Sequence, residues 1–391
     1  MRPEDPYWAI GNLVTIYGPR SRVICLVQDM NMNGAVWRPE EDNDATANIE
    51  LLGEIVDEPN GRPMFRRGIM NYPPLGAPVH RIRSDDLVSM YDLRERKAST
   101  VGTLVMDESI QAAINIEGML KKHFAVVGTT GVGKSTSVSI LLRKAIEERP
   151  KLRVVILDPH NEYSNVFKDV ASTVDSRNFE LPFWLFRFEE ITEVVFRGTK
   201  PDSDEIDFLR DAIIAAKEMY EGGGTPQPGS ILKKTLRTEG VAVTADAPQP
   251  YRINDLLSLI DDALGRLEQK YEKSALKSLK ARLESLSNDP NYKFMFGTAA
   301  IDGMSEPVIR QLFRLHDSTR RITVLQLAGI PSDVVNASVS VLSRMAFDQC
   351  VNSAGRNEIL LLCEEAHRYV PAGAGNIFTP ARRSIARVAK E

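Results

Sequence analysis

The stretch Gly128-Thr-Thr-Gly-Val-Gly-Lys-Ser-Thr136 decides how this chain folds. It follows the apolar run Phe124-Ala-Val-Val127, which predicts a short buried strand, and it precedes helical apolar spacing over residues 134–148. Pro150 predicts the end of that helix. A second apolar run, residues 153–158, predicts the next strand. Apolar strands that alternate with helices predict an α/β fold with a parallel sheet covered on both faces.

The same stretch fits the pattern Gly-x-x-x-x-Gly-Lys-Ser/Thr of a phosphate-binding loop. Glycines let backbone N–H groups converge on phosphate oxygens, and the following helix directs its N-terminal dipole at the same anion. We expect Lys134 to reach the β- and γ-phosphates of a nucleotide, the Ser135 hydroxyl to ligate Mg²⁺, and Thr136 to contact the α-phosphate. The loop that we expect to hold the nucleotide consists of Gly128, Thr129, Thr130, Gly131, Val132, Gly133, Lys134, Ser135 and Thr136.

Two glutamates follow a third apolar run, at residues 359–363. In open α/β sheets, ligands bind at the carboxyl ends of the strands, so this run would deliver both carboxylates to the nucleotide. Hydrolysis needs one carboxylate on the metal side and one group that prepares water. We assign Glu364 to the Mg²⁺ water shell and Glu365 to water activation.

Asp158 and His160 stand in Asp158-Pro-His-Asn-Glu-Tyr163, at the end of the predicted strand 153–158. In one interpretation they lie beside the phosphate loop and polarise water or sense the γ-phosphate. In the other, Asp-Pro-His-Asn is only a turn with a helix cap.

Composition sets further limits. The net charge of −4 provides no global basic field for nucleic acid, although a ring can carry local basic patches in its channel. The three cysteines have neither metal spacing nor a disulfide framework, which favours a reducing cytoplasm. No apolar run approaches the roughly 20 residues of a membrane helix, so we expect no membrane partner.

The remaining sequence predicts three regions. Residues 1–110 contain short strands at 13–17, 22–27 and 49–56 and an acidic loop at 38–48, which together favour a small β-barrel. Residues 111–391 form the α/β domain, with a helical insertion at about 187–300. The insertion has helical patterns at 203–220 and 254–286, with the loop 222–229 between them. The sheet resumes at 322–327, and a helix over 333–352 leads to the strand 359–363.

Three motifs resemble the HerA branch of the HerA–FtsK ATPases: His123–Ser135, Leu157–Tyr163 and Glu364-Glu-Ala-His-Arg-Tyr-Val-Pro371. The N-terminal β-rich part is similar to the small barrel of that family, and Thr323–Pro331 resembles its next strand. The resemblance implies a RecA-like fold, a hexameric ring, hydrolysis of ATP with Mg²⁺, and movement along double-stranded DNA. It also implies a partner nuclease similar to NurA, or another effector, for example in DNA end processing or antiviral defence.

The chain departs from the family pattern in two places. The family often has Asp-Glu where this chain has Glu364-Glu365, which leaves the division of roles between the two carboxylates open. The chain also stops at residue 391, where relatives continue into further motifs, so we expect a truncated chain. The arginine finger of the family belongs near Arg382, Arg383, Arg387 and Lys390. Lys390 aligns best but lacks the planar guanidinium, and Arg387 is the next candidate.

Three functions remain open at this point. The leading one is a ring-shaped ATP-driven DNA translocase or helicase that works with a nuclease or effector. The alternative is an ATP-regulated ring scaffold that assembles a partner effector with little or no translocation. A small-molecule kinase is the third, and the helical insertion and the Glu364-Glu365 pair argue against it.

Overall fold

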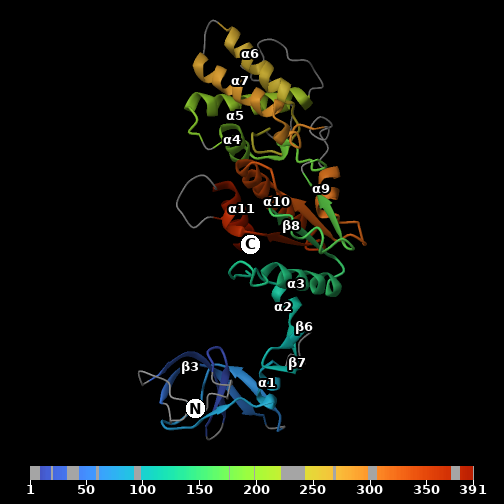
Figure 1. The fold of residues 1–391 in the computed structure, drawn as a ribbon. Coiled ribbons are helices and arrows are strands. Elements are labelled where there is room, and N and C mark those ends of the chain that lie inside the picture. The colour runs from blue at the N-terminus through green and yellow to red at the C-terminus, as the bar shows by residue number, and fades with distance from the viewer. Residues whose placement is uncertain are drawn as a thin grey trace. The chain divides into compact units, whose positions relative to one another are not determined.

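The computed structural model describes residues 9–18, 21–32, 44–58, 61–91, 98–175, 177–197, 199–221, 243–266, 270–297, 306–370 and 379–390. The chain divides into two compact units, Met1–Ala125 and Val126–Glu391. Figure 1 labels their helices and strands. The predicted loop 222–229 lies outside the described residues.

The first unit is built on an antiparallel sheet with the strand order β4-β3-β2-β1-β5. The predicted strands 13–17 and 22–27 are confirmed, and they pair as an antiparallel hairpin in which Leu13 lies opposite Leu26 and Tyr17 opposite Arg22. The described pairings leave β4 and β5 as the two edges, so closure into a barrel stays a prediction. The strands and helices of this unit are β1 (Leu13–Tyr17), β2 (Arg22–Met32), β3 (Ala45–Asp57), β4 (Pro63–Arg67), β5 (Val79–Arg81), α1 (Ser84–Tyr91), β6 (Ser99–Leu104), β7 (Asp107–Ile114) and α2 (Ile116–Leu120).

The prediction of a loop over residues 38–48 was wrong for its last four residues, which belong to β3. Ala45 pairs with Met32 and Asn48 with Asp29, so β3 continues as the partner of a long β2. The acidic composition of residues 38–48 favoured a loop, but cross-strand pairing overrides such a weak local preference.

The second unit contains a four-stranded parallel sheet with the order β11-β8-β10-β9. Every residue of the central strand β8 is buried, as expected for a parallel strand with helices on both faces. The parallel sheet of the predicted α/β fold is therefore confirmed. Its strands are β8 (Leu152–Asp158), β9 (Ala171–Val174), β10 (Ile322–Gln326) and β11 (Glu358–Cys363).

Helices α3, α9 and α10 contact this sheet, and α10 and α11 lie side by side (Figure 1). The predicted helix 134–148 is confirmed as α3, whereas the predicted helix 254–286 is two helices, α6 and α7. The helices are α3 (Lys134–Glu148), α4 (Phe188–Phe196), α5 (Ser203–Glu221), α6 (Ile253–Gly265), α7 (Lys273–Asn288), α9 (Glu306–Phe313), α10 (Ser332–Asn352) and α11 (Thr379–Lys390).

The prediction of a buried strand at Phe124–Val127 was wrong. These residues form no strand, and the side chains of Phe124, Val126 and Val127 are exposed, Val127 to 88%. Four apolar residues suffice for a strand only when a neighbouring strand supplies hydrogen bonds, and the described residues provide no such partner. Among the described residues no strand pairs with the outer side of β11, which therefore lies at one edge of the sheet.

Candidate nucleotide site

The phosphate loop adopts a conformation that only its glycines permit. Gly131 and Gly133 have φ values of 82° and 95°, in the left-handed region that favours glycine. A Cβ on Gly128 would lie 2.7 Å from Cγ1 of Val132. Gly133 also caps the N-terminus of α3, so the loop passes directly into the first helical turn.

The side chains of the loop start from this turn. Lys134 Nζ donates hydrogen bonds to the carbonyl oxygens of Gly128 and Thr129, both at 3.1 Å. The ammonium group therefore lies within the curve of the loop. There it can form hydrogen bonds with phosphate oxygens in place of these carbonyl oxygens. Thr136 is exposed on the first turn of α3, and the loop residues Gly128–Val132 are exposed as well.

Three strands end together at the carboxyl edge of the sheet. Gln326, the last residue of β10, is in register with Asp158, the last residue of β8. Cys363 at the end of β11 is in register with Leu157. Glu364 therefore emerges next to Asp158, and its N–H donates to the carbonyl oxygen of Leu157 at 3.3 Å.

Asp158 is fully buried and holds the turn that follows β8. Its carboxylate accepts the backbone N–H groups of His160 at 3.3 Å, Glu162 at 3.2 Å and Tyr163 at 3.0 Å. This geometry agrees with the turn interpretation of the sequence, while the His160 side chain is exposed. A catalytic role for Asp158 or His160 stays a prediction.

The turn brings the phosphate loop and the end of β11 into one group of side chains. Ser135 Oγ donates to Glu162 Oε2 at 2.6 Å, and the Tyr163 hydroxyl donates to Glu364 Oε2 at 2.7 Å. Burial, together with the hydrogen bond to Glu364, raises the pKa of Tyr163 well above its usual value. The two residues assigned to the metal side, Ser135 and Glu364, are thus linked by two consecutive residues of the turn.

Glu365 has a different setting from Glu364. It adopts a left-handed conformation with a φ of 51° and begins a short 3₁₀ turn. Its Oε2 lies 3.1 Å from Nδ1 of His367, whose side chain is exposed. The conformation turns the two adjacent carboxylates toward different partners, as two different roles would require.

The oxygen donors of this group suit Mg²⁺. Mg²⁺ prefers hard oxygen ligands, keeps several waters, and is usually held by one or two protein groups together with nucleotide phosphates. Ser135 and Glu364 supply such oxygens. Among the described residues no set of three or more His, Cys, Asp or Glu side chains could hold a metal alone.

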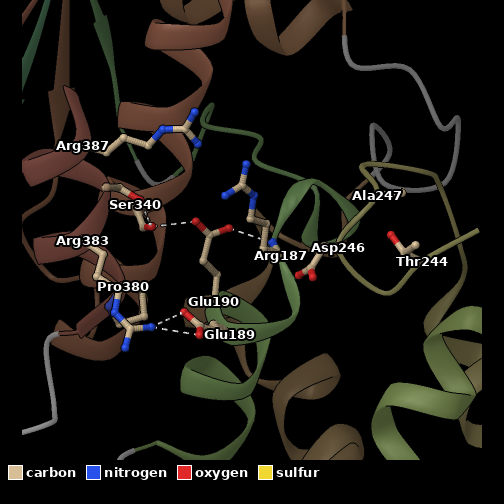
Figure 2. A pocket seen from close by; sticks show the side chains of 11 residues that line it. Arg187, Glu189, Glu190, Thr244, Asp246, Ala247, Ser340, Pro380, Arg383 and Arg387 are labelled. Carbon is tan, nitrogen blue, oxygen red and sulfur yellow. Dashed lines mark hydrogen bonds and ion pairs between the residues drawn. The ribbon is translucent and has the colours of Figure 1, made fainter. Parts of the chain in front are cut away.

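The arginine-finger candidates lie elsewhere in the unit. Arg383 and Arg387 of α11 line a cavity of about 540 Å³ together with Arg187, Glu189 and Glu190 of the α4 region (Figure 2). Arg383 Nη1 donates to both carboxylate oxygens of Glu189 at 2.9 Å, and the Arg387 guanidinium lies 5.2 Å from the ring centre of Phe347. No residue of the phosphate loop lines this cavity. Lys390 is exposed at the end of α11.

The roles of three residues were not predicted: Glu162, Tyr163 and Gln326. Gln326 Nε2 donates to Ser164 Oγ at 2.9 Å and so ties the same turn to β10. Glu162 and Tyr163 belong to the motif Asp158–Tyr163. The carboxylate of Glu162, four residues after Asp158, was the feature of the sequence that could have indicated a role at the site. The contact between Tyr163 and Glu364 depends on the strand order, which the sequence pattern does not specify.

Comparison with known proteins now adds to this geometry. The family described as "Helicase HerA, central domain" matches residues 99–346, more than half of the chain. This chain belongs to the HerA helicase central-domain family. The predicted resemblance is therefore confirmed.

The matched relatives include two that are named DNA double-strand break repair helicase HerA. The DNA double-strand break repair helicase HerA of Pyrococcus furiosus is 31% identical over 126 residues, which is 32% of this chain and 21% of the relative. The protein of the same name from Saccharolobus solfataricus is 22% identical over 371 residues, covering 89% of this chain and 65% of the relative. The chain thus spans less than two thirds of each of these relatives.

Among solved structures, VirB4 of Thermoanaerobacter pseudethanolicus aligns with a TM-score of 0.45 and 12% identity, covering 74% of this chain and 81% of that one. The HerA-family assignment rests on the sequence match. Separately, the described part of the chain contains no helix that is both long and apolar enough to cross a membrane.

Proposed function

We propose that this chain is the ATP-hydrolysing part of a hexameric HerA-type translocase that moves along double-stranded DNA. The observation that carries the proposal is the link between the phosphate loop and the end of β11 through Glu162 and Tyr163. This link supports the proposal because hydrolysis of a nucleoside triphosphate requires a phosphate-binding loop and a carboxylate at the same edge of the sheet.

In this proposal each residue has a distinct task. Lys134 and the loop amides bind the β- and γ-phosphates, and Thr136 contacts the α-phosphate. Ser135 and Glu364 hold Mg²⁺, which neutralises charge on the phosphates when it is bound. Glu365 orients or deprotonates the attacking water. Arg387, or Lys390, reaches the nucleotide of a neighbouring subunit.

DNA as the substrate rests on the family, two of whose members are named DNA double-strand break repair helicases. Contact with the phosphate backbone would be independent of sequence and sensitive to salt. A nuclease similar to NurA, or an antiviral effector, is the partner that we propose for the ring.

ATP hydrolysis by the wild type and by Lys134→Ala, with and without duplex DNA, tests the proposal. We expect hydrolysis that DNA stimulates and that salt suppresses, and a loss of about 100-fold or more in Lys134→Ala, because the phosphates lose their cation. Lys144→Ala is the matched control, since Lys144 lies on α3 and pairs with Glu147 at the surface. Hydrolysis that ignores DNA, or that survives in Lys134→Ala, would contradict the proposal.

A ring scaffold for a partner effector is the second candidate. The observation that favours it is a run of exposed apolar side chains in the first unit, at Met70, Tyr72 and Leu75. A scaffold would retain effector activation in Glu365→Gln, which binds nucleotide but does not turn it over. A translocase would lose activation in the same variant.

A further inference from the structure

The turn after β8 reaches two separate parts of the candidate site with two consecutive side chains. Glu162 accepts the hydroxyl proton of Ser135 at 2.6 Å. Tyr163 donates its own hydroxyl proton to Glu364 at 2.7 Å. One side chain therefore contacts the phosphate loop and the next contacts the carboxylate at the end of β11.

The positions of these two residues are set by the turn itself. The Asp158 carboxylate accepts the backbone N–H groups of Glu162 and Tyr163. Asn161, which directly precedes Glu162 in the turn, has a left-handed φ of 61°. The Tyr163 ring is fully buried and stacks on Phe167 with ring centres 6.3 Å apart. The turn would therefore keep its conformation without the contacts to Ser135 and Glu364.

The segment that directly follows this turn is bound to the helix that carries Ser135. Arg143 of α3 pairs with Asp169 at 2.9 Å and 3.0 Å and donates to the Val166 carbonyl oxygen at 2.6 Å. Its guanidinium lies 5.3 Å from the ring centre of Phe167. α3 and the turn consequently keep a fixed relation, so the contact between Ser135 and Glu162 does not depend on one hydrogen bond.

The direction of each hydrogen bond determines which lone pairs remain available. A serine hydroxyl has one proton, so donation to Glu162 directs the lone pairs of Ser135 elsewhere. The phenol of Tyr163 occupies Oε2 of Glu364 and leaves Oε1 for another partner. Residues that fix the orientation of metal ligands typically change metal affinity by about 10- to 100-fold when they are replaced.

We propose that Glu162 and Tyr163 are positioning residues for the magnesium-bound nucleotide. Glu162 orients Ser135 by accepting its proton, and Tyr163 orients the Glu364 carboxylate by donating to it. This inference rests on the proposed function, because that function assigns Ser135 and Glu364 to the metal side of the nucleotide.

Binding of a non-hydrolysable ATP analogue tests the inference without relying on turnover. The measurement is the Mg²⁺ concentration that gives half-maximal analogue binding, together with the affinity for the analogue in the presence of a chelator. We expect Glu162→Ala and Tyr163→Phe to raise the half-maximal Mg²⁺ concentration by about 10-fold or more. The affinity without metal should stay at the wild-type value.

Conservative replacements separate positioning from structural damage. Glu162→Gln replaces the carboxylate with an amide, whose oxygen can still accept the hydrogen bond from Ser135. The Mg²⁺ requirement of this variant should therefore lie between those of the wild type and Glu162→Ala. Glu162 is exposed, so Glu162→Ala should fold normally. Tyr271→Phe is the matched control, because its hydroxyl donates to the carboxylate of Asp211 at 2.6 Å, away from the phosphate loop. It should behave as wild type.

Each outcome decides a different point. If the wild type binds no analogue even with Mg²⁺, the proposed function fails. If the wild type binds and both Glu162→Ala and Tyr163→Phe keep its Mg²⁺ requirement, the inference is wrong and the proposed function stands. Equal losses with and without Mg²⁺ would show a role in nucleotide binding or folding and would also contradict the inference.

Discussion

Glu190 is the centre of a buried polar network, and its removal should destabilise the second unit. The Glu190 side chain is only 4% exposed. Its Oε1 accepts from Ser340 Oγ at 2.6 Å, and its Oε2 accepts from the backbone N–H of Arg187 at 2.7 Å and from Arg344 Nη2 at 3.1 Å. Figure 2 shows Glu190 between Ser340 and Arg187. The network thus joins α4 to α10 and, through a contact of 2.7 Å between Ser340 and Ser384, to α11.

The magnitude follows from what Glu190→Ala would leave behind. The Arg344 side chain is 10% exposed, and its Nη2 would keep only the Leu185 carbonyl oxygen at 2.7 Å as an acceptor. Breaking a buried ion pair by removing one partner typically costs about 3–5 kcal/mol. Ser340→Ala removes one hydrogen bond to a charged group and should cost about 1.5–3 kcal/mol. The combined Glu190→Ala and Arg344→Leu change should cost less than Glu190→Ala alone, because no buried charge remains.

Trp184 provides the assay, since it is buried and is the only tryptophan in residues 126–391. With Trp8 and Trp37 replaced by Phe in every variant, urea unfolding followed by fluorescence reports on the second unit. That restriction is needed because a two-unit chain has no single free energy of unfolding. A cost below about 1 kcal/mol for Glu190→Ala would refute the reasoning, because the pair would then behave as a surface ion pair.

Three further predictions concern pH and turnover. Burial lowers the pKa of Lys217 to about 8 from 10.5, and the ammonium donates to the carbonyl oxygens of Thr244, Ala245 and Ala247. Between pH 8 and 10.5 the unfolded chain binds more protons than the folded chain. The free energy of unfolding should therefore rise over that range by up to about 3 kcal/mol relative to Lys217→Met. Urea unfolding that gave parallel pH profiles for the wild type and Lys217→Met would contradict this. Glu365→Gln should retain binding of Mg²⁺-ATP, and its turnover in a steady-state assay should fall by about 10²–10⁴-fold. Full turnover in this variant would show that another group activates the water. Arg387→Ala should reduce turnover by about 10³-fold while nucleotide binding stays intact. Arg383→Ala loses only an exposed ion pair with Glu189, so it should not reduce turnover. Equal effects of the two changes would show that Arg387 is not the arginine finger.

Segments with a clear apolar pattern were mostly predictable from the sequence, whereas segments that depend on distant partners were not. α3 has the predicted bounds, and α10 and β11 start within one residue of them, because an apolar stripe or a continuous apolar run marks such elements clearly. β9 has only four residues and no distinctive pattern, and it was missed. Phe124–Val127 has the composition of a strand, but strand formation depends on a partner that local sequence does not reveal.

The candidate site was predictable to a similar extent. The phosphate loop and the Glu364-Glu365 pair were visible because glycine spacing and carboxylates at a strand end have direct chemical reasons. Glu162 and Tyr163 were not singled out, since the contact of Tyr163 with Glu364 depends on the alignment of β8 with β11, and the contact of Glu162 with Ser135 depends on the packing of the turn against α3. Asp158 attracted attention as an acid, yet its oxygens are occupied by the backbone of the turn.

The edge strand β11 has a practical consequence for handling the protein. Its outer side carries main-chain N–H and C=O groups that no described strand pairs, and its sequence contains Ile359 followed by three leucines. Unprotected edges of this kind recruit strands from other molecules and start aggregation. We therefore expect concentrated protein to aggregate on warming by pairing at this strand. A lysine substituted on the outer edge of β11 should slow that aggregation.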